Sequence, residues 1–219
     1  MTKNLIFFAT LLIIFMLNIS DNVISAEAQD EEADPVLDLD GNKLQTGTSY
    51  YFIPSFRPGG GVTIYPTADK NCTNGVAQLV FGVGLPVTFA YGETDPDVVR
   101  VSTNLTISFS PGILYSPAVW KVDEYDPAGE KNLITSGEID SNEASINRWF
   151  QIRKDLFPGY YKFVFCPKFC ESCTQICTDV GISIYDEIRR FVVEGTLSST
   201  FAFKKFEAGT NSTNGYLVA

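Results

Sequence analysis

Histidine is absent from the 219 residues of this chain. Without an imidazole, a single chain cannot build a Ser-His-Asp or Cys-His nucleophilic centre, nor a zinc site with histidine ligands. Acidic pairs such as Glu138 with Asp140, or Asp186 with Glu187, are available for acid–base chemistry, but such pairs are common on solvated strand ends. We therefore expect a protein that is not an enzyme and that binds no cofactor and no metal.

Basic residues are also scarce, with 16 Lys and Arg against 26 Asp and Glu, for a net charge of −10. Nucleic acids and anionic membrane surfaces are bound through a basic footprint. Neither is an expected partner of this chain. Beyond the N-terminus, no segment is long and apolar enough to span a membrane, because spanning takes about 20 apolar residues.

The N-terminus has the pattern of a secretion signal. Lys3 precedes the apolar run Leu5–Leu17, and small residues follow at Ala26 and Ala28. A positive charge, a short apolar core and an A-x-A arrangement are typical of a cleaved signal peptide. We expect residues 1–28 to be removed, with a cut after Ala26 as the alternative to a cut after Ala28.

The mature chain divides into three parts by composition. Residues 29–35 are acidic, end in proline and are expected to be disordered. Residues 208–219, "AGTNSTNGYLVA", are expected to form a flexible tail. Residues 36–207, which lie between them, are enough for one domain with a real core.

Three N-x-S/T sequons, at Asn71, Asn104 and Asn211, are candidate glycosylation sites in a secreted chain. We expect one or two of them to carry a glycan, since the pattern also occurs by chance. Cys72 stands in the middle of the first sequon, which makes Asn71 the weakest of the three candidates.

Four of the five cysteines lie within residues 166–177. Their x3, x2, x3 spacing leaves no room for the two separated C-x-x-C knuckles of a four-thiolate zinc site. A thioredoxin-like dithiol would sit at a helix N-terminus, whereas residues 178–193 are rich in β-branched and aromatic side chains. The pattern favours structural disulfides over a metal site or a redox pair at Cys170 and Cys173.

Four cysteines allow three pairings. A nested pairing, Cys166–Cys177 around Cys170–Cys173, would tie the base of a hairpin and stiffen its tip. The outer bridge would close a loop of about a dozen residues and contribute about 2–3 kcal/mol. Cys72 has no obvious partner, so the protein is expected to be a monomer with an unpaired Cys72 or a dimer bridged through it.

The mature chain shows the two-residue period of half-buried strands. Leu105, Ile107 and Phe109 alternate with polar residues, and other segments repeat the pattern. Turn signals such as Asp40-Gly41 and Pro158-Gly159 punctuate these segments. No window of a dozen residues has helical periodicity, so we predict an all-β domain, a barrel or a sandwich.

The segment "VLDLDGNKLQTGTSYYF", residues 36–52, resembles the opening signature of the plant Kunitz inhibitors of the soybean trypsin inhibitor type. The matching positions are Val36, Asp38, Asp40, Gly41, Leu44 and Tyr50. Phe52 departs from the pattern, since an aliphatic residue is usual there. The resemblance continues through "GGGVTIYP", "LTISF", "AVWKVDEYD", "WFQIRK", "YYKFVFCP" and "DVGISI", nearly the whole mature chain. The cysteine cluster is similar to that of the miraculin-like branch.

This resemblance implies a single-domain β-trefoil of twelve strands in three similar units, stapled by the nested disulfides. It also implies a protease inhibitor that acts outside the cytosol, in the extracellular space or cell wall or in the vacuole. In relatives, a cysteine near the position of Cys72 is bridged to one just before the tryptophan strand. Here that stretch reads "GILYSPAVW", residues 112–120, and has no cysteine.

The family's reactive loop aligns with residues 90–103, "AYGETDPDVVRVST". The candidate residues are Thr94, Asp95, Pro96, Asp97 and Arg100, with the scissile position close to Asp95-Pro96. Trypsin-like pockets end in a carboxylate and select Arg or Lys, so an aspartate there is repelled and must also be desolvated. Arg100 abuts the next strand and is expected to be poorly presented, so strong trypsin inhibition is not expected.

We therefore expect a secreted inhibitor whose partner is an endopeptidase, of the serine type by family resemblance. One alternative is a non-inhibitory trefoil with a storage, stress or ligand-binding role. A second is inhibition of a papain-like cysteine protease through another loop, at residues 57–61 or 126–132. A third is redox catalysis at Cys170 and Cys173, which counting free thiols would separate from structural disulfides.

Overall fold

The computed structural model describes residues 33–55, 59–66, 74–92, 97–113, 118–126, 131–137, 146–167, 176–185 and 187–207. The predicted signal segment 1–28 and the predicted tail 208–219 lie outside these ranges, and so do residues 29–32. Asp34 and Pro35 depart from the prediction that residues 29–35 are disordered. Both lie within the described ranges, and Pro35 forms a β-bridge with Arg100.

The described residues form an all-β fold, which confirms the prediction from the two-residue period. The strands are β1 (Tyr50–Pro54), β2 (Val62–Pro66), β3 (Asn74–Gln78), β4 (Val87–Ala90), β5 (Thr106–Phe109), β6 (Val119–Asp126), β7 (Lys131–Gly137), β8 (Phe150–Lys154), β9 (Tyr161–Phe165), β10 (Thr178–Tyr185), β11 (Ile188–Val193), β12 (Leu197–Ser198) and β13 (Thr200–Lys205).

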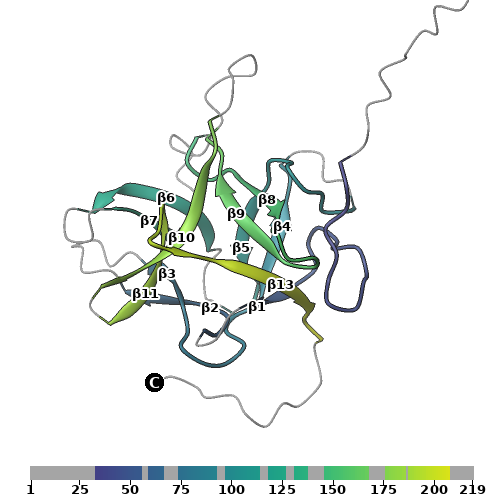
Figure 1. Cartoon of the computed structure of the whole chain (residues 1–219), viewed down its shortest axis with the longest axis horizontal. Helices are drawn as coiled ribbons and strands as arrows, with labels where there is room; N and C mark the ends of the chain where they lie inside the picture. The colour runs from purple at the N-terminus through teal and green to yellow at the C-terminus, as the bar shows by residue number, and fades with distance from the viewer. Residues whose placement is uncertain are drawn as a thin grey trace, which may run out of the picture. The chain divides into compact units, whose positions relative to one another are not determined.

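Six of these strands close into a barrel (Figure 1). β5, β4, β1, β13, β9 and β8 pair in that order, each antiparallel to its neighbours. Leu105, just before β5, bridges to Phe150 at the start of β8 and so joins the two ends of the row. Closure leaves none of these six strands as an open edge, the usual site of unwanted pairing between chains.

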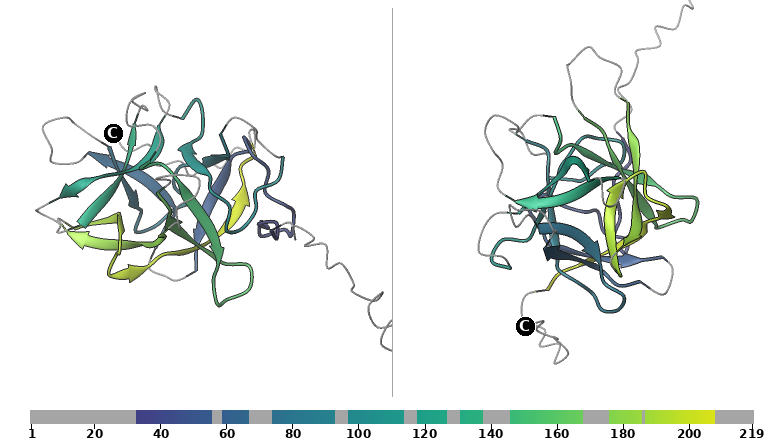
Figure 2. Two further views of the ribbon diagram at one scale, coloured as in Figure 1. Left: turned by 90° about the horizontal axis from the view of Figure 1, so that it is seen from above. Right: turned by 90° about the vertical axis from the view of Figure 1, so that its left-hand side faces the viewer.

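Three hairpins, β2–β3, β6–β7 and β10–β11, gather at one end of the barrel (Figure 2, left). They pair with one another through β3–β7, β11–β3 and β11–β7 contacts. Each hairpin belongs to one of three similar units, β1–β4, β5–β8 and β9–β13. Three such units around one barrel make the β-trefoil that the family resemblance implied.

The described part of the chain contains thirteen strands where twelve were expected. The extra strand arises because the last strand of the third unit is divided at Ser199. Leu197 and Ser198 pair with β10, whereas the chain from Thr200 onward pairs with β9 and β1. Ser199 is buried and its hydroxyl donates to the Val180 carbonyl at 2.9 Å, which fixes the change of partner.

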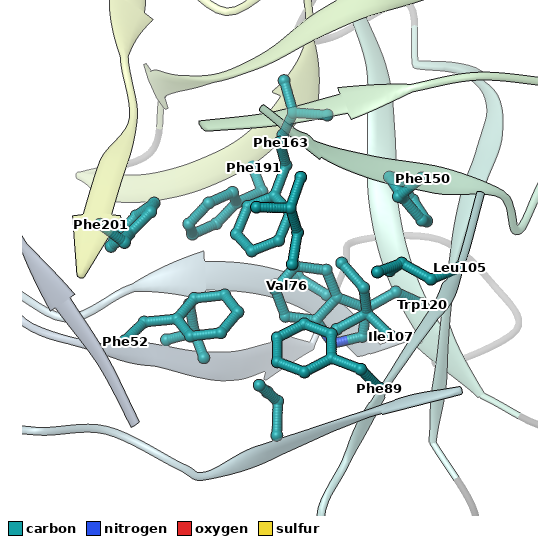
Figure 3. Close-up of a cluster of buried hydrophobic side chains, with 14 of the residues drawn as sticks. Phe52, Val76, Phe89, Leu105, Ile107, Trp120, Phe150, Phe163, Phe191 and Phe201 are labelled. Atoms are coloured by element: carbon teal, nitrogen blue, oxygen red, sulfur yellow. The ribbon is translucent and has the colours of Figure 1, made fainter. Parts of the chain in front are cut away.

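Aromatic rings and aliphatic side chains together fill the core (Figure 3). Phe52 is fully buried at the centre of this cluster. Its ring stacks on those of Phe89 and Phe163, with centroids 6.3 and 5.0 Å away, and meets Trp120 edge-on at 5.9 Å. All three units contribute to this cluster, so its packing joins them.

We predict that Phe52→Ala lowers the free energy of unfolding by about 3–5 kcal/mol, through lost burial and the cavity left behind. Phe81→Ala is the matched control, since Phe81 is 78% exposed and its loss should change stability by less than about 0.5 kcal/mol. Urea denaturation measures both changes. Equal stabilities of the two variants would contradict the central place of Phe52.

The outer disulfide is present. Cys166 and Cys177 are bonded, with their Cα atoms 4.3 Å apart. The adjacent residues Phe165 and Thr178 pair at the junction of β9 and β10, so the bridge ties the base of this connection, as predicted. Cys170, Cys173 and Cys72 lie outside the described residues, and their predicted states stay predictions.

Removing this bridge with the double change Cys166→Ala/Cys177→Ala should cost about 3 kcal/mol, because the bridge limits the entropy of the unfolded chain. The urea midpoint of the variant is compared with that of Ile176→Ser, an exposed neighbour inside the same loop. An unchanged midpoint in the double variant would show that the bridge adds nothing to stability.

Candidate functional site

The connection between β4 and β5 is braced by the N-terminal segment, residues 34–46. Pro35 bridges to Arg100 and Gln45 bridges to Val98, so the far limb of the connection lies between two stretches of this segment. The predicted reactive residues Thr94, Asp95 and Pro96 lie outside the described residues. The described chain thus defines how the two limbs that flank them are held.

Backbone hydrogen bonds fix the limb of residues 97–101. The Val36 N–H donates to the Val99 carbonyl at 2.9 Å, and the Val99 N–H donates to Leu44 at 2.8 Å. The Thr46 N–H donates to the carbonyl of Asp97 at 3.2 Å. Val99 is fully buried between these partners. This limb is therefore as firmly paired as a strand of the barrel.

Tyr91 ties the two limbs together. Its hydroxyl oxygen accepts the N–H of Arg100 at 2.6 Å, across the residues that carry the predicted scissile position. Further along, the Ser102 N–H donates to Ile152 of β8 at 2.8 Å, while Ser102 itself adopts a left-handed φ of 56°. Both ends of the loop are thereby anchored to the barrel.

Trp149 lies against the near limb. A Cβ on Gly92 would come within 3.6 Å of the Trp149 ring, so the chain passes close over the indole there. The guanidinium carbon of Arg148 lies 5.4 Å from the centroid of the same ring, a cation–π arrangement. The near limb therefore leaves β4 beside the Trp149 ring, which also makes the cation–π contact with Arg148.

Arg100 is directed back to the N-terminal segment. Its Nη1 donates to the Ala33 carbonyl at 2.8 Å and the residue is half-buried. A neighbouring ion pair, Lys154 with Asp34 at 2.6 Å, holds the same segment against β8. The hydrogen bond from Lys154 and its charge lower the pKa of the Asp34 carboxyl below its ordinary value, and the pKa of Lys154 is raised in turn.

Of the predicted reactive-loop residues, the described structure shows two, Asp97 and Arg100, on one braced limb. Asp97 is exposed, whereas Arg100 is held by its bond to Ala33. Sequence reasoning missed Tyr91, Thr46 and Trp149. An aromatic or a threonine at these places carries no signal by itself, because each acts only through a partner distant in sequence.

The other predicted sites are the alternative surface 57–61 and the three candidate glycosylation sites. In the alternative surface 57–61, Gly60 and Gly61 are buried against the backbone of residues 81–84 and so are not presented. Asn104 is half-buried, and its Oδ1 accepts from Gln151 at 2.8 Å. Asn71 and Asn211 lie outside the described residues.

No cluster of three or more metal-ligating side chains occurs within the described ranges. The same ranges contain no helix long and apolar enough to cross a membrane.

A braced connection on a β-trefoil is compatible with the class of protein that the sequence resembles, the plant Kunitz protease inhibitors. The chain matches the Kunitz legume family model, described as "Trypsin and protease inhibitor", over residues 36–205. It therefore belongs to the plant Kunitz protease inhibitor family. This family is one of inhibitors rather than enzymes, which agrees with the expectation drawn from the missing histidine.

Curated relatives cover most of the chain. Miraculin of Synsepalum dulcificum is 39% identical over 189 residues, 81% of this chain and 86% of the relative. Kunitz trypsin inhibitor 5 of Arabidopsis thaliana is 34% identical over 193 residues, 84% of this chain and 93% of the relative. Trypsin inhibitor A of Glycine max is 31% identical over 189 residues, 80% and 82% of the two chains.

Solved structures confirm the fold. Soybean trypsin inhibitor superimposes with a TM-score of 0.64 at 27% identity, over 79% of this chain and all of the inhibitor. A complex of porcine pancreatic trypsin with soybean trypsin inhibitor gives a TM-score of 0.65 at 26% identity, over 80% of this chain and 100% of the matched chain.

The tie between Tyr91 and Arg100 can be tested by Tyr91→Phe. The change removes this acceptor of the Arg100 N–H and should lower the free energy that holds the two limbs together by about 1 kcal/mol. Cleavage of the chain between residues 91 and 100 should then be about fivefold faster. Limited digestion with a broad-specificity protease, read by mass spectrometry, measures the rate. Tyr65→Phe on β2 is the control, and equal rates in the two variants would refute the tie.

Proposed function

We propose that this protein is a secreted inhibitor of endopeptidases that occupies a protease cleft with the loop of residues 94–100. The observation that carries the proposal is the bracing of residues 97–101 by backbone bonds to residues 34–46 and by the Tyr91 hydroxyl. Fixed ends limit the entropy that the loop between them can lose on binding. This is the property that a substrate-like inhibitor needs.

The chemistry of the loop argues against a trypsin-like target. Asp95 lies close to the predicted scissile position, and the exposed Asp97 adds a second negative charge nearby. Bringing a carboxylate to a carboxylate-floored pocket costs both repulsion and desolvation. Pro96 also lacks an N–H and restricts the backbone after the scissile position. We propose a serine protease with a different pocket as the target.

The relatives support inhibition as a function without fixing the target. They include proteins named as trypsin inhibitors, and one of the matched structures is a complex with trypsin. Miraculin and a 21 kDa seed protein of Theobroma cacao, 37% identical over 67% of this chain and 70% of the relative, carry no such name. A non-inhibitory storage, stress or ligand-binding trefoil is therefore the alternative.

Secretion is part of the same proposal. The N-terminal pattern of residues 1–28 and the Cys166–Cys177 bridge both suit an oxidising route to the extracellular space, the cell wall or the vacuole. Glycosylation at Asn104 would fit this route. Mass spectrometry of the natural protein, before and after glycosidase treatment, checks the N-terminus and the glycan together.

The decisive experiment measures inhibition of trypsin, chymotrypsin, an aspartate-preferring serine protease and a papain-like enzyme. We predict weak inhibition of trypsin by the natural chain and a gain of at least about 100-fold in Asp95→Arg, because an opposite charge then meets the pocket. Arg100→Ala is the matched control, and its inhibition should be unchanged because Arg100 is turned toward Ala33.

Other outcomes have definite meanings. Trypsin inhibition that survives Asp95→Arg unchanged but disappears in Arg100→Ala would place the working side chain at residue 100. Inhibition of the papain-like enzyme that neither change affects would move the working surface to another loop. No inhibition across the panel, with Asp95→Arg also inactive, would favour the non-inhibitory trefoil.

A further inference from the structure

A pocket of about 670 Å³ opens between the N-terminal segment and the turn that joins β8 to β9. Its size lies within the range of about 300–1,000 Å³ that small-molecule sites occupy. Apolar and aromatic side chains from both segments line it: Leu37, Leu39, Leu156, Phe157, Tyr160 and Tyr161. The inhibitory loop proposed above does not include these residues.

The apolar walls of this pocket are unusually open to water. Leu156 is 95% exposed, Phe157 is 56% exposed and Leu39 is 52% exposed. Three large apolar side chains on two facing segments form a contiguous patch, whereas isolated exposed apolar residues are ordinary. Covering them would be favoured by the hydrophobic effect in proportion to the area removed from water.

The walls are held in place before any ligand arrives. The Leu37 N–H donates to the hydroxyl oxygen of the buried Tyr161 at 2.9 Å. The Leu39 N–H donates to Phe203 of β13 at 2.8 Å, and the Asp155 N–H donates to Tyr160 at 2.9 Å. A pocket fixed in this way binds without a large entropy loss of its own.

The charge at the pocket is negative. Asp34, Asp38 and Asp155 line it, and Lys154 is the one basic side chain among the lining residues. Lys154 pairs with Asp34 at 2.6 Å, so these two charges largely compensate each other. The Asp38 carboxylate accepts the N–H groups of Asp40 and Asn42, so Asp155 supplies the negative charge that these contacts leave over. A pocket with a net negative charge and apolar walls attracts ligands of the opposite sign. The aromatic faces of Phe157 and Tyr160 also favour a cation.

We propose that this pocket binds a small organic cation with an apolar body, such as an alkylammonium or arylammonium compound. The apolar body lies along Leu39 and Phe157, and the ammonium group lies toward Asp155 and the ring face of Tyr160. This activity is independent of protease inhibition. A negatively charged amphiphile of the same length would be repelled.

Three probes of one chain length test the proposal on the mature protein: n-octylammonium, n-octanol and n-octanoate at pH 7. Shifts of the leucine methyl signals in NMR titrations give the three dissociation constants. We expect octylammonium to bind at least about fivefold more tightly than octanol, and octanoate more weakly than either. Raising the ionic strength should weaken octylammonium binding and leave octanol binding unchanged.

Variants separate the two parts of the site. Leu39→Ser with Phe157→Ser should weaken octylammonium and octanol alike, whereas Asp155→Asn should weaken only octylammonium. Leu197→Ser, a partly exposed leucine on β12, is the matched control and should bind like the natural chain. Each variant is first checked for its native methyl dispersion.

Equal binding of the three probes, or binding that survives the loss of Leu39 and Phe157, would overturn the proposal. So would an equal loss in Leu197→Ser, since it would indicate adsorption to exposed leucines in general. The protease panel serves as an independent readout. Binding of octylammonium without inhibition of any protease would show that the proposed inhibitory function has failed. Inhibition without binding would show that the pocket proposal has failed.

Discussion

The pairing of residues 34–46 with residues 97–101 is the constraint on which both proposed functional surfaces depend. On one side it fixes the far limb of the β4–β5 connection through the carbonyls of Leu44, Asp97 and Val99. On the other side the same segment supplies Leu37 and Leu39 to the pocket beside β8 and β9. A short N-terminal segment, which adds no named strand to the barrel, thus shapes two separate parts of the surface.

The groups that hold the β4–β5 connection differ from the groups that would contact a partner. Backbone N–H and carbonyl groups do most of the holding, and any residue other than proline supplies both. The side chains at the loop are therefore free to change charge without loss of the fold. The acidic sequence of this chain in a family that includes trypsin inhibitors is consistent with that freedom, and under the proposed function a few residues would decide the target.

Features that depend on local pattern were predictable from sequence, and those that depend on distant partners were not. Alternation at Leu105, Ile107 and Phe109 predicted the strand β5, and the cysteine spacing allowed the Cys166–Cys177 bridge. The contact between Tyr91 and Arg100 has no such signal, because it exists only once the loop has closed. The pocket likewise requires two segments more than 100 residues apart to meet.

The closed barrel also affects how the protein is made. β1 has β13 as its main partner, with Tyr50 opposite Lys205 near the two ends of the described chain. The first strand can therefore meet this partner only after residues 201–205 have been synthesised. Pairing between segments so far apart in the sequence slows folding. Changes in β13 therefore act on the first strand of the barrel as well as on the last.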